Sequence, residues 1–267
     1  PRTSSAASDV YKRQAYMPLD TTANAQIFLE RTKPKVAIFL KSEFWPNFFK
    51  KLHHNSIPTY VVSAIFKPQH HLFKFYGKWH LGILKGVSHF FVQDEESKTL
   101  LNKKGIYQVT ISGDNRYDKV FEDSIHSKDI PYINSFKGSH PLVVAGSTYK
   151  IDSKMLINIS NRMPEVKFIL APHETGLCND LKKYGLLYSQ ANKDNVKNHS
   201  ILIIDSIGIL SQLYQYANFS YIGGAFGKGL HNILEAIAFG SYVFFGPKFH
   251  NYEEAKEAID AGIAQSI

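Results

Sequence analysis

Cysteine is almost absent from this chain of 267 residues, which holds only Cys178. A lone cysteine excludes a disulfide framework and a cysteine-based metal site, and it suits a reducing compartment. There is also no run of about 18 apolar residues, the length that a membrane-spanning helix needs, and no signal peptide. The chain is nevertheless 44% hydrophobic and 13% aromatic, so it can bury the cores of two domains of ordinary size.

Patterns for metal binding are missing as well. No His, Cys and carboxylate residues stand at ligand spacing and there is no Asp-x-Asp, so neither a metal nor a cofactor is expected. Internal repeats, low-complexity tracts and coiled-coil heptads are not evident. The aromatic residues follow core-like periods without the basic and aromatic interleaving of stacking surfaces, which argues against nucleic-acid binding.

Negative charge is scarce in the first half of the chain. Residues 1–134 hold 19 Lys and Arg against 12 Asp and Glu, whereas residues 135–267 hold 12 against 11. A basic half suggests an anionic partner on that side, such as a nucleic acid, a phospholipid or a phosphorylated substrate. The alternative is that this charge only maintains solubility.

Apolar strand patterns alternate with helical patterns along the chain, which predicts parallel sheets of the α/β class. The expected strands lie at 35–40, 58–63, 88–92, 108–111, 142–145, 166–171, 201–205, 218–222 and from 242 to about 246. A polar stretch at 126–140 interrupts the alternation and is interpreted as a linker. We therefore expect an unpatterned, possibly foreign leader at 1–14, then two Rossmann-like domains at 15–125 and 141–267 with a cleft between them.

A glycine loop and the elements beside it stand out between Tyr221 and Gly240. Four glycines within seven residues follow an apolar strand, and a helical pattern starts at Asn232 and stops at Gly240. Such an arrangement aims backbone N–H groups and a helix N-terminus at an anion, which glycine allows to come close. The spacing fits neither GxGxxG nor a Walker A loop. The alternative is a tight loop followed by a capping box of Asn232 and Glu235.

Polar residues follow other expected strands, at the edge where open α/β sheets bind ligands. Ser147 and Thr148 are candidates for binding phosphate, and His173 is a candidate donor to a phosphate or a base. Glu43 is either a catalytic or acceptor-binding carboxylate or a favourable charge at a helix N-terminus. Arg116 is either an anion partner or solvated surface charge.

Six segments, in order along the chain, resemble the Kdo transferase family, whose members transfer 3-deoxy-D-manno-octulosonic acid (Kdo) from CMP-Kdo to lipid A precursors. They are FLKSEFWPN at 39–47, GDNRYD at 113–118, GST at 146–148, APHE at 171–174, GGAFGKGLHNILE at 223–235 and the stretch 245–254. The glycine loop with its His-Asn-x-Leu-Glu is the most specific of them. The resemblance implies the GT-B fold, whose two Rossmann-like domains agree with the alternating pattern.

The resemblance also implies roles for individual residues. CMP would be bound by Pro172, His173, Gly223, Gly224, Ala225, Asn232, Ile233, Leu234 and Glu235. The Glu235 carboxylate would accept the ribose hydroxyls while the helix N-terminus faces the phosphate. Arg116 would stabilise charge in the transition state, and Ser147, Thr148 and Lys41 are further candidates for phosphate or sugar contacts.

Two departures from the family pattern concern catalysis. Lys41 stands where the family commonly has the first Glu of Glu-x-Glu-Leu-Trp-Pro-Asn, which leaves Glu43 as the candidate for that role. The family's general base, a Glu in a Ser-Val-Gly-Glu segment, has no counterpart in this sequence, and neither has its membrane anchor. We therefore expect a fragment that lacks both ends and is inactive by itself.

The resemblance implies a glycosyltransferase of lipopolysaccharide core biosynthesis at the cytoplasmic face of the bacterial inner membrane. Kdo would pass from CMP-Kdo to the anionic lipid IVA by direct displacement, and the basic first half would face the membrane surface. One alternative is another GT-B nucleotide-sugar enzyme, such as a UDP-sugar transferase or a 2-epimerase. A second alternative is a nucleotide-sugar-binding module without catalytic activity.

Overall fold

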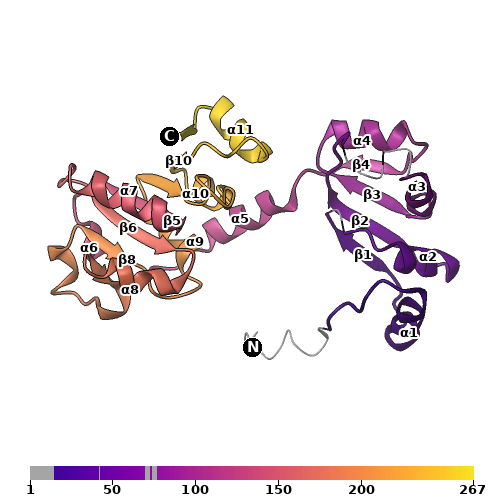
Figure 1. The fold of residues 1–267 in the computed structure, drawn as a ribbon, viewed down its shortest axis with the longest axis horizontal. Coiled ribbons are helices and arrows are strands. Elements are labelled where there is room, and N and C mark those ends of the chain that lie inside the picture. The colour runs from indigo at the N-terminus through magenta and orange to yellow at the C-terminus, as the bar shows by residue number, and fades with distance from the viewer. Residues whose placement is uncertain (1–14, 42, 70–72, 74–76) are drawn as a thin grey trace. The chain divides into compact units, whose positions relative to one another are not determined.

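The computed structural model describes residues 15–41, 43–69, 73 and 77–267. The chain divides into two compact units between Asn115 and Arg116, and each unit contains a parallel β-sheet with helices (Figure 1). No helix among the described residues is both long enough and apolar enough to cross a membrane.

The first unit is built on a four-stranded parallel sheet with the order β1-β2-β3-β4. Its strands are β1 (Ala37–Leu40), β2 (Thr59–Ala64), β3 (His89–Val92) and β4 (Val109–Ile111), and its helices are α1 (Thr22–Thr32), α2 (Pro46–His54), α3 (Lys78–Leu84) and α4 (Glu95–Asn102). Aromatic and branched side chains form the core, among them the buried Phe49, Val61, Phe66 and Phe90.

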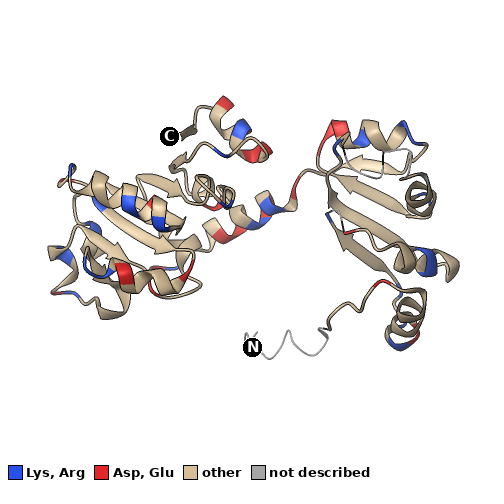
Figure 2. Cartoon of the chain, viewed as in Figure 1, with Lys and Arg blue, Asp and Glu red and all other residues tan. Residues whose placement is uncertain are grey.

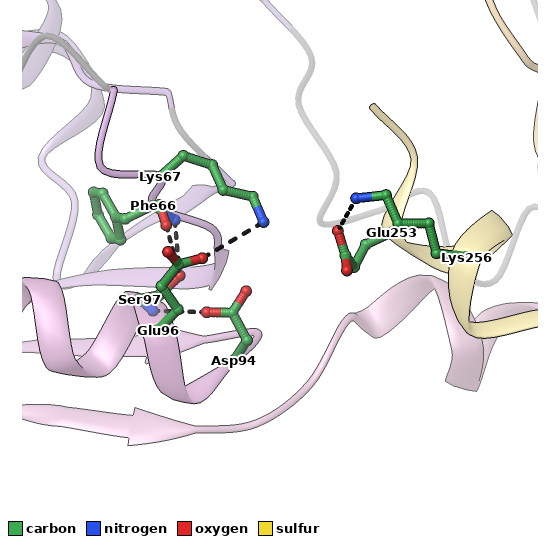
Figure 3. A network of polar contacts seen from close by, with 7 residues as sticks. All are labelled: Phe66, Lys67, Asp94, Glu96, Ser97, Glu253 and Lys256. Carbon is green, nitrogen blue, oxygen red and sulfur yellow. Dashed lines mark hydrogen bonds and ion pairs between the residues drawn. The ribbon is translucent and has the colours of Figure 1, made fainter. Parts of the chain in front are cut away.

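Local sequence explains where two of these helices begin. Proline occupies the first position of α2, where its missing N–H costs nothing. Asp94 caps α4 by accepting a hydrogen bond from the Ser97 N–H at 2.7 Å, as N-terminal Asp residues commonly do. The buried Ser97 hydroxyl then accepts the Phe66 N–H at 2.8 Å, which joins α4 to the segment after β2 (Figure 3).

The second unit is built on a seven-stranded parallel sheet with the order β11-β10-β9-β5-β6-β8-β7. The strands are β5 (Leu142–Thr148), β6 (Lys167–Pro172), β7 (Leu186–Leu187), β8 (Ile201–Ile203), β9 (Phe219–Ile222), β10 (Tyr242–Phe245) and β11 (Ala264–Ser266). The α-helices are α5 (Asn115–Ile125), α6 (Ile133–Lys137), α7 (Lys150–Ser160), α8 (Cys178–Leu181), α9 (Leu210–Leu213), α10 (Leu234–Ala238) and α11 (Glu253–Asp260). Single turns of 3₁₀-helix lie at Thr175–Leu177, Tyr188–Gln190, Val196–Asn198 and Tyr214–Tyr216.

The expected α/β class with parallel sheets is confirmed, and each expected strand is present with shifted ends. Two further strands, β7 and β11, were not expected. The interdomain cleft stays a prediction, because each unit is described by itself.

The division of the chain differs from the one that the sequence suggested. Instead of a linker, residues 126–140 contain α6, and Ile133 and Phe136 of this helix are fully buried in the core of the second unit. Only these two apolar positions mark the helix in a polar stretch with Pro131 and Gly138, which is too little for a recognisable helical period.

The order of the second sheet places a topological switch point beside β5. After β5 the chain forms β6, β7 and β8 on one side, and it then crosses to β9 on the other side. Open α/β sheets bind ligands outside the carboxyl ends of the strands at such a point. The loops after β5 and β9 are therefore the place to look for a functional site.

Candidate functional site

The ends of β5 and β9 approach each other backbone to backbone. The Gly223 N–H donates to the Gly146 carbonyl oxygen at 2.9 Å, and a Cβ on Gly223 would lie 2.4 Å from the Ser147 carbonyl oxygen. Gly224 has a φ of +97°, and Ser147 has a φ of +53°, a backbone conformation that residues other than glycine rarely adopt. The first two glycines of the loop are thus required for this close packing.

All four glycine N–H groups of the loop donate hydrogen bonds within the protein. Gly227 and Gly229 both donate to the Gly224 carbonyl oxygen, while Gly224 itself donates to the Asp152 carboxylate. The sequence suggested that these groups point at an anion. The structure instead uses them to shape the loop, and the contacts of Gly223, Gly224 and the buried Ala225 with CMP stay predictions.

The fully buried Asp152 holds three parts of the site together. Its carboxylate accepts hydrogen bonds from the Tyr149 N–H at 2.8 Å, the Tyr221 hydroxyl at 2.6 Å and the Gly224 N–H at 3.3 Å. These donors come from the start of α7, from β9 and from the glycine loop. Burial and the bond to Asp152 raise the pKa of Tyr221, so this hydroxyl keeps its proton.

Three aromatic rings cluster above these strand ends. The His173 and His231 rings lie 4.5 Å apart between centroids, and each packs against the Tyr149 ring, at 5.1 Å and 5.6 Å. His231 Nε2 lies 3.1 Å from the Tyr149 hydroxyl oxygen. The His173 N–H donates to the Thr148 carbonyl oxygen at 3.0 Å, which ties the loop after β6 to the end of β5.

A charged pair lies next to the rings. Lys228 Nζ is 4.8 Å from the centroid of the Tyr149 ring and 3.2 Å from Glu174 Oε1. Both charged side chains are about two-thirds exposed, so water and salt screen their attraction. Burial lowers the pKa of His231, the neighbouring His173 lowers it further, and the Asp152 charge opposes both effects.

The helix after the glycine loop is shorter than expected. It covers only Leu234–Ala238 rather than Asn232 to Gly240, because the His231 N–H is bonded to the Gly223 carbonyl oxygen and keeps the preceding chain in the loop. A helix N-terminus facing phosphate at Asn232 is therefore not present. The Ile233 and Leu234 side chains are buried in the core, so their expected contacts with CMP through side chains do not fit.

The expected capping box between Asn232 and Glu235 does not form, and the two side chains bond differently. The Asn232 side chain accepts the Leu234 N–H at 3.2 Å and donates to Glu235 Oε1 at 3.1 Å. Burial raises the pKa of Glu235, the hydrogen bond from Asn232 opposes this, and the Asp123 charge raises the pKa further. A partly buried carboxylate held in this way can accept hydrogen bonds from a ligand.

The other predicted residues of the second unit are placed as follows. Pro172 ends β6 next to His173, and Ser147 is half-buried at the end of β5. Thr148 is fully buried and its hydroxyl accepts a hydrogen bond from Ser153 at 3.1 Å, so the expected contact of its side chain with phosphate does not fit. Arg116 belongs to this unit as well, and its guanidinium donates to Glu254 of α11 at 2.9 Å.

The remaining candidates lie in the first unit, at the end of β1. Lys41 is exposed and has a φ of +57°. Glu43 is also exposed, and its carboxylate accepts the Trp45 indole N–H at 3.2 Å.

Sequence reasoning missed four residues that build the site: Tyr149, Asp152, Tyr221 and His231. His231 stands inside the motif that carried the resemblance, and Asp152 follows Tyr149 by the three residues typical of a capping box. Their contacts depend on β9 lying next to β5, which a local pattern does not reveal.

Comparison with known proteins points to one family. Residues 2–119 match the family model described as 3-deoxy-D-manno-octulosonic-acid transferase (kdotransferase). The chain is 26% identical over 244 residues to the 3-deoxy-D-manno-octulosonic acid transferase of Rickettsia typhi, covering 87% of this chain and 52% of that protein. It is also 26% identical over 255 residues to the protein of that name from Haemophilus influenzae, covering 90% and 59%.

The chain therefore spans between half and three-fifths of the length of these relatives. Among solved structures, the UDP-GlcNAc 2-epimerase of Methanocaldococcus jannaschii superposes with a TM-score of 0.59 at 15% identity, covering 92% of this chain and 70% of that one. At this identity the likeness shows a shared fold and says nothing about the ligand.

Proposed function

We propose that this chain belongs to the family of 3-deoxy-D-manno-octulosonic acid transferases, which its similarity to the family model and to two named relatives supports, and that the whole protein transfers Kdo from CMP-Kdo to the lipid A precursor lipid IVA. The observation that supports this best is the length of the similarity to named Kdo transferases, which covers 87–90% of the chain and so includes both units. This reaction would make the protein a glycosyltransferase of lipopolysaccharide core biosynthesis.

The donor would bind at the switch point of the second sheet. The phosphate of CMP would lie by the Tyr149, His173 and His231 rings, which offer hydrogen-bond donors next to the start of the eleven-residue helix α7. A helix N-terminus of this length favours an anion. The Glu235 carboxylate would accept the ribose hydroxyls, and Asn232 holds that carboxylate in place.

The transfer would be a direct displacement. An acceptor hydroxyl attacks the anomeric carbon of Kdo, the bond from that carbon to the phosphate oxygen breaks, and CMP leaves with the electron pair while a base takes the hydroxyl proton. His173 and Arg116 would stabilise the charge on the leaving phosphate. Glu254 accepts a hydrogen bond from the Arg116 guanidinium at 2.9 Å, and this pairing orients the guanidinium. Glu43 is the candidate carboxylate on the acceptor side.

The acceptor lipid is anionic, and the first half of the chain is the more basic one. Lys and Arg of that half are distributed over the first unit and α5 (Figure 2). Basic segments are attracted to the negatively charged cytoplasmic leaflet by about 1 kcal/mol per Lys or Arg. This charge supports a place at the cytoplasmic face of the inner membrane, with the lipid approached from the side of the first unit.

Calorimetric titration of the 267-residue chain with CMP and with UMP tests the donor site. Glu235→Gln should weaken CMP binding at least tenfold, because a neutral amide accepts hydrogen bonds from ribose hydroxyls less strongly than a carboxylate. Glu122→Gln, at an exposed position of α5, is the matched control and should bind as the parent does.

The outcomes separate the candidate functions. CMP binding that Glu235→Gln weakens at least tenfold supports the Kdo transferase donor site. A preference for UMP contradicts it and favours a UDP-sugar enzyme of the same fold. CMP binding together with no Kdo transfer by the whole protein would favour a binding module.

A further inference from the structure

We propose that His231 is a further donor-binding residue, which acts with His173 and Tyr149 as a proton-linked site for the phosphate group of the nucleotide. This inference rests on the proposed function and deepens it, because it links phosphate binding at these rings to the protonation of His231. It makes donor binding depend on the uptake of a proton by an imidazole.

The geometry brings two imidazoles together where an anion is expected. Their centroids are 4.5 Å apart at the carboxyl ends of β6 and β9, and backbone hydrogen bonds fix both residues, from His173 to Thr148 and from His231 to Gly223. Two positive charges at this separation would repel each other, which disfavours protonation of His231. A phosphate between the rings and the solvent would remove that penalty.

The direction of the hydrogen bond between His231 and Tyr149 depends on the protonation of His231. In a neutral His231, Nε2 can accept the Tyr149 hydroxyl proton across the 3.1 Å contact. A protonated imidazole has only donors, so Nε2 then donates to the Tyr149 oxygen. The Tyr149 O–H is thereby released and can donate to a phosphate oxygen. Proton uptake by one ring thus supplies both a positive charge and a second donor.

The other charged groups around His231 are compatible with its protonation when an anion binds. Asp152, on α7, favours the protonated imidazole. Lys228, in the glycine loop, lies over the Tyr149 ring and opposes a second positive charge, but Glu174 pairs with it on the exposed side. His173 is the remaining neighbour; burial of His231 and the proximity of His173 both lower the pKa of His231, and an anion at the rings would oppose these effects.

The test follows the imidazoles themselves. The chain, labelled at its histidines, is titrated from pH 5 to pH 9 by NMR, alone and with CMP, UMP, cytidine or inorganic phosphate. The signals of His173 and His231 are assigned by through-bond correlation and by their loss in His173→Gln and His231→Gln. Because the NMR signal of each imidazole is followed individually, its titration is distinguished from that of the phosphate group, which occurs near pH 6. His126, exposed directly after α5, is the internal control.

CMP and phosphate should raise the pKa of His231 by a unit or more, which corresponds to a roughly tenfold gain in affinity on protonation, whereas cytidine and the His126 signal should show no such change. Because the bound pKa is higher, affinity is greatest at low pH and falls as the pH rises through the bound pKa. His173→Arg, whose charge is permanent, should keep the site cationic and lower the pKa of His231 in the free protein.

Two results distinguish a failure of this inference from a failure of the proposed function. If calorimetry shows CMP binding while neither imidazole changes its pKa, the inference is wrong and the donor site stands. If UMP or phosphate raises the pKa of His231 but CMP does not, the inference stands and the proposed donor is wrong. If no ligand changes either imidazole, the inference is overturned.

Discussion

Tyr221→Phe removes one hydroxyl from a buried polar cluster of the second unit. The Tyr221 hydroxyl donates to Asp152 at 2.6 Å, and the two residues are 2% and 0% exposed. Phenylalanine fills the same volume, so no cavity opens and the substitution isolates the hydrogen bond. A buried hydrogen bond to a charged group contributes about 1.5–3 kcal/mol. For a unit of about 150 residues this corresponds to a decrease in Tm of roughly 3–12 °C.

Unfolding is best followed locally, because the chain has two units. Urea denaturation with hydrogen-exchange mass spectrometry of β5 and β9 reports on the second unit alone. Tyr184→Phe, at a residue that is 49% exposed in the same unit, is the matched control and should change stability by less than about 0.5 kcal/mol. If Tyr221→Phe lowers the stability of the second unit no more than Tyr184→Phe does, the hydrogen bond from Tyr221 to Asp152 does not stabilise the site.

Three further predictions concern other positions. Gly223→Ala should destabilise the second unit by about 1–3 kcal/mol or more in urea denaturation, because the added Cβ would meet the backbone of β5. Gly227→Ala is the control, because a Cβ at Gly227 meets open space. Equal effects of the two substitutions would contradict the close packing at Gly223. Ser97→Ala should destabilise the first unit by about 1–3 kcal/mol, since it leaves the buried N–H of Phe66 without this acceptor; no loss of stability would refute this. Glu235→Gln should raise the Tm of the second unit at pH 8 but not below about pH 4.5. The reason is that the raised pKa of Glu235 in the folded state lowers stability only where this carboxyl is ionised. A gain in Tm that persists at pH 4 would contradict this reasoning.

The sequence predicted the strands well where a run is apolar and rich in branched residues, whether the strand is buried, as β8 is, or partly exposed, as β1 is. The runs 35–40 and 201–205 are nearly all apolar and rich in branched residues, which favour strands by themselves. The strands β7, of two residues, and β11, with the sequence Ala-Gln-Ser, have no such signal. They exist because β8 and β10 offer them an edge to pair with, which is a property of the fold rather than of the segment.

The site was predicted in its location more than in its contacts. The loops after β5, β6 and β9 were expected at one edge, and the structure places them there. The sequence could not tell that the hydroxyl of Thr148 is turned inward toward Ser153. Nor could it pair Tyr149 with His231, which lie 82 positions apart and meet because β9 inserts beside β5.

The most direct test of the donor site is a map of the backbone amide shifts that CMP causes in the chain. We predict that the largest shifts fall in residues 146–149, 172–174 and 223–235, around the Tyr149 and histidine rings, and that they shrink in Glu235→Gln. The groove between α7 and α8, lined by Lys154 and Lys183 among others, serves as the comparison surface. Shifts concentrated in that groove would show that CMP is held by surface lysines, and they would contradict a donor site at the switch point.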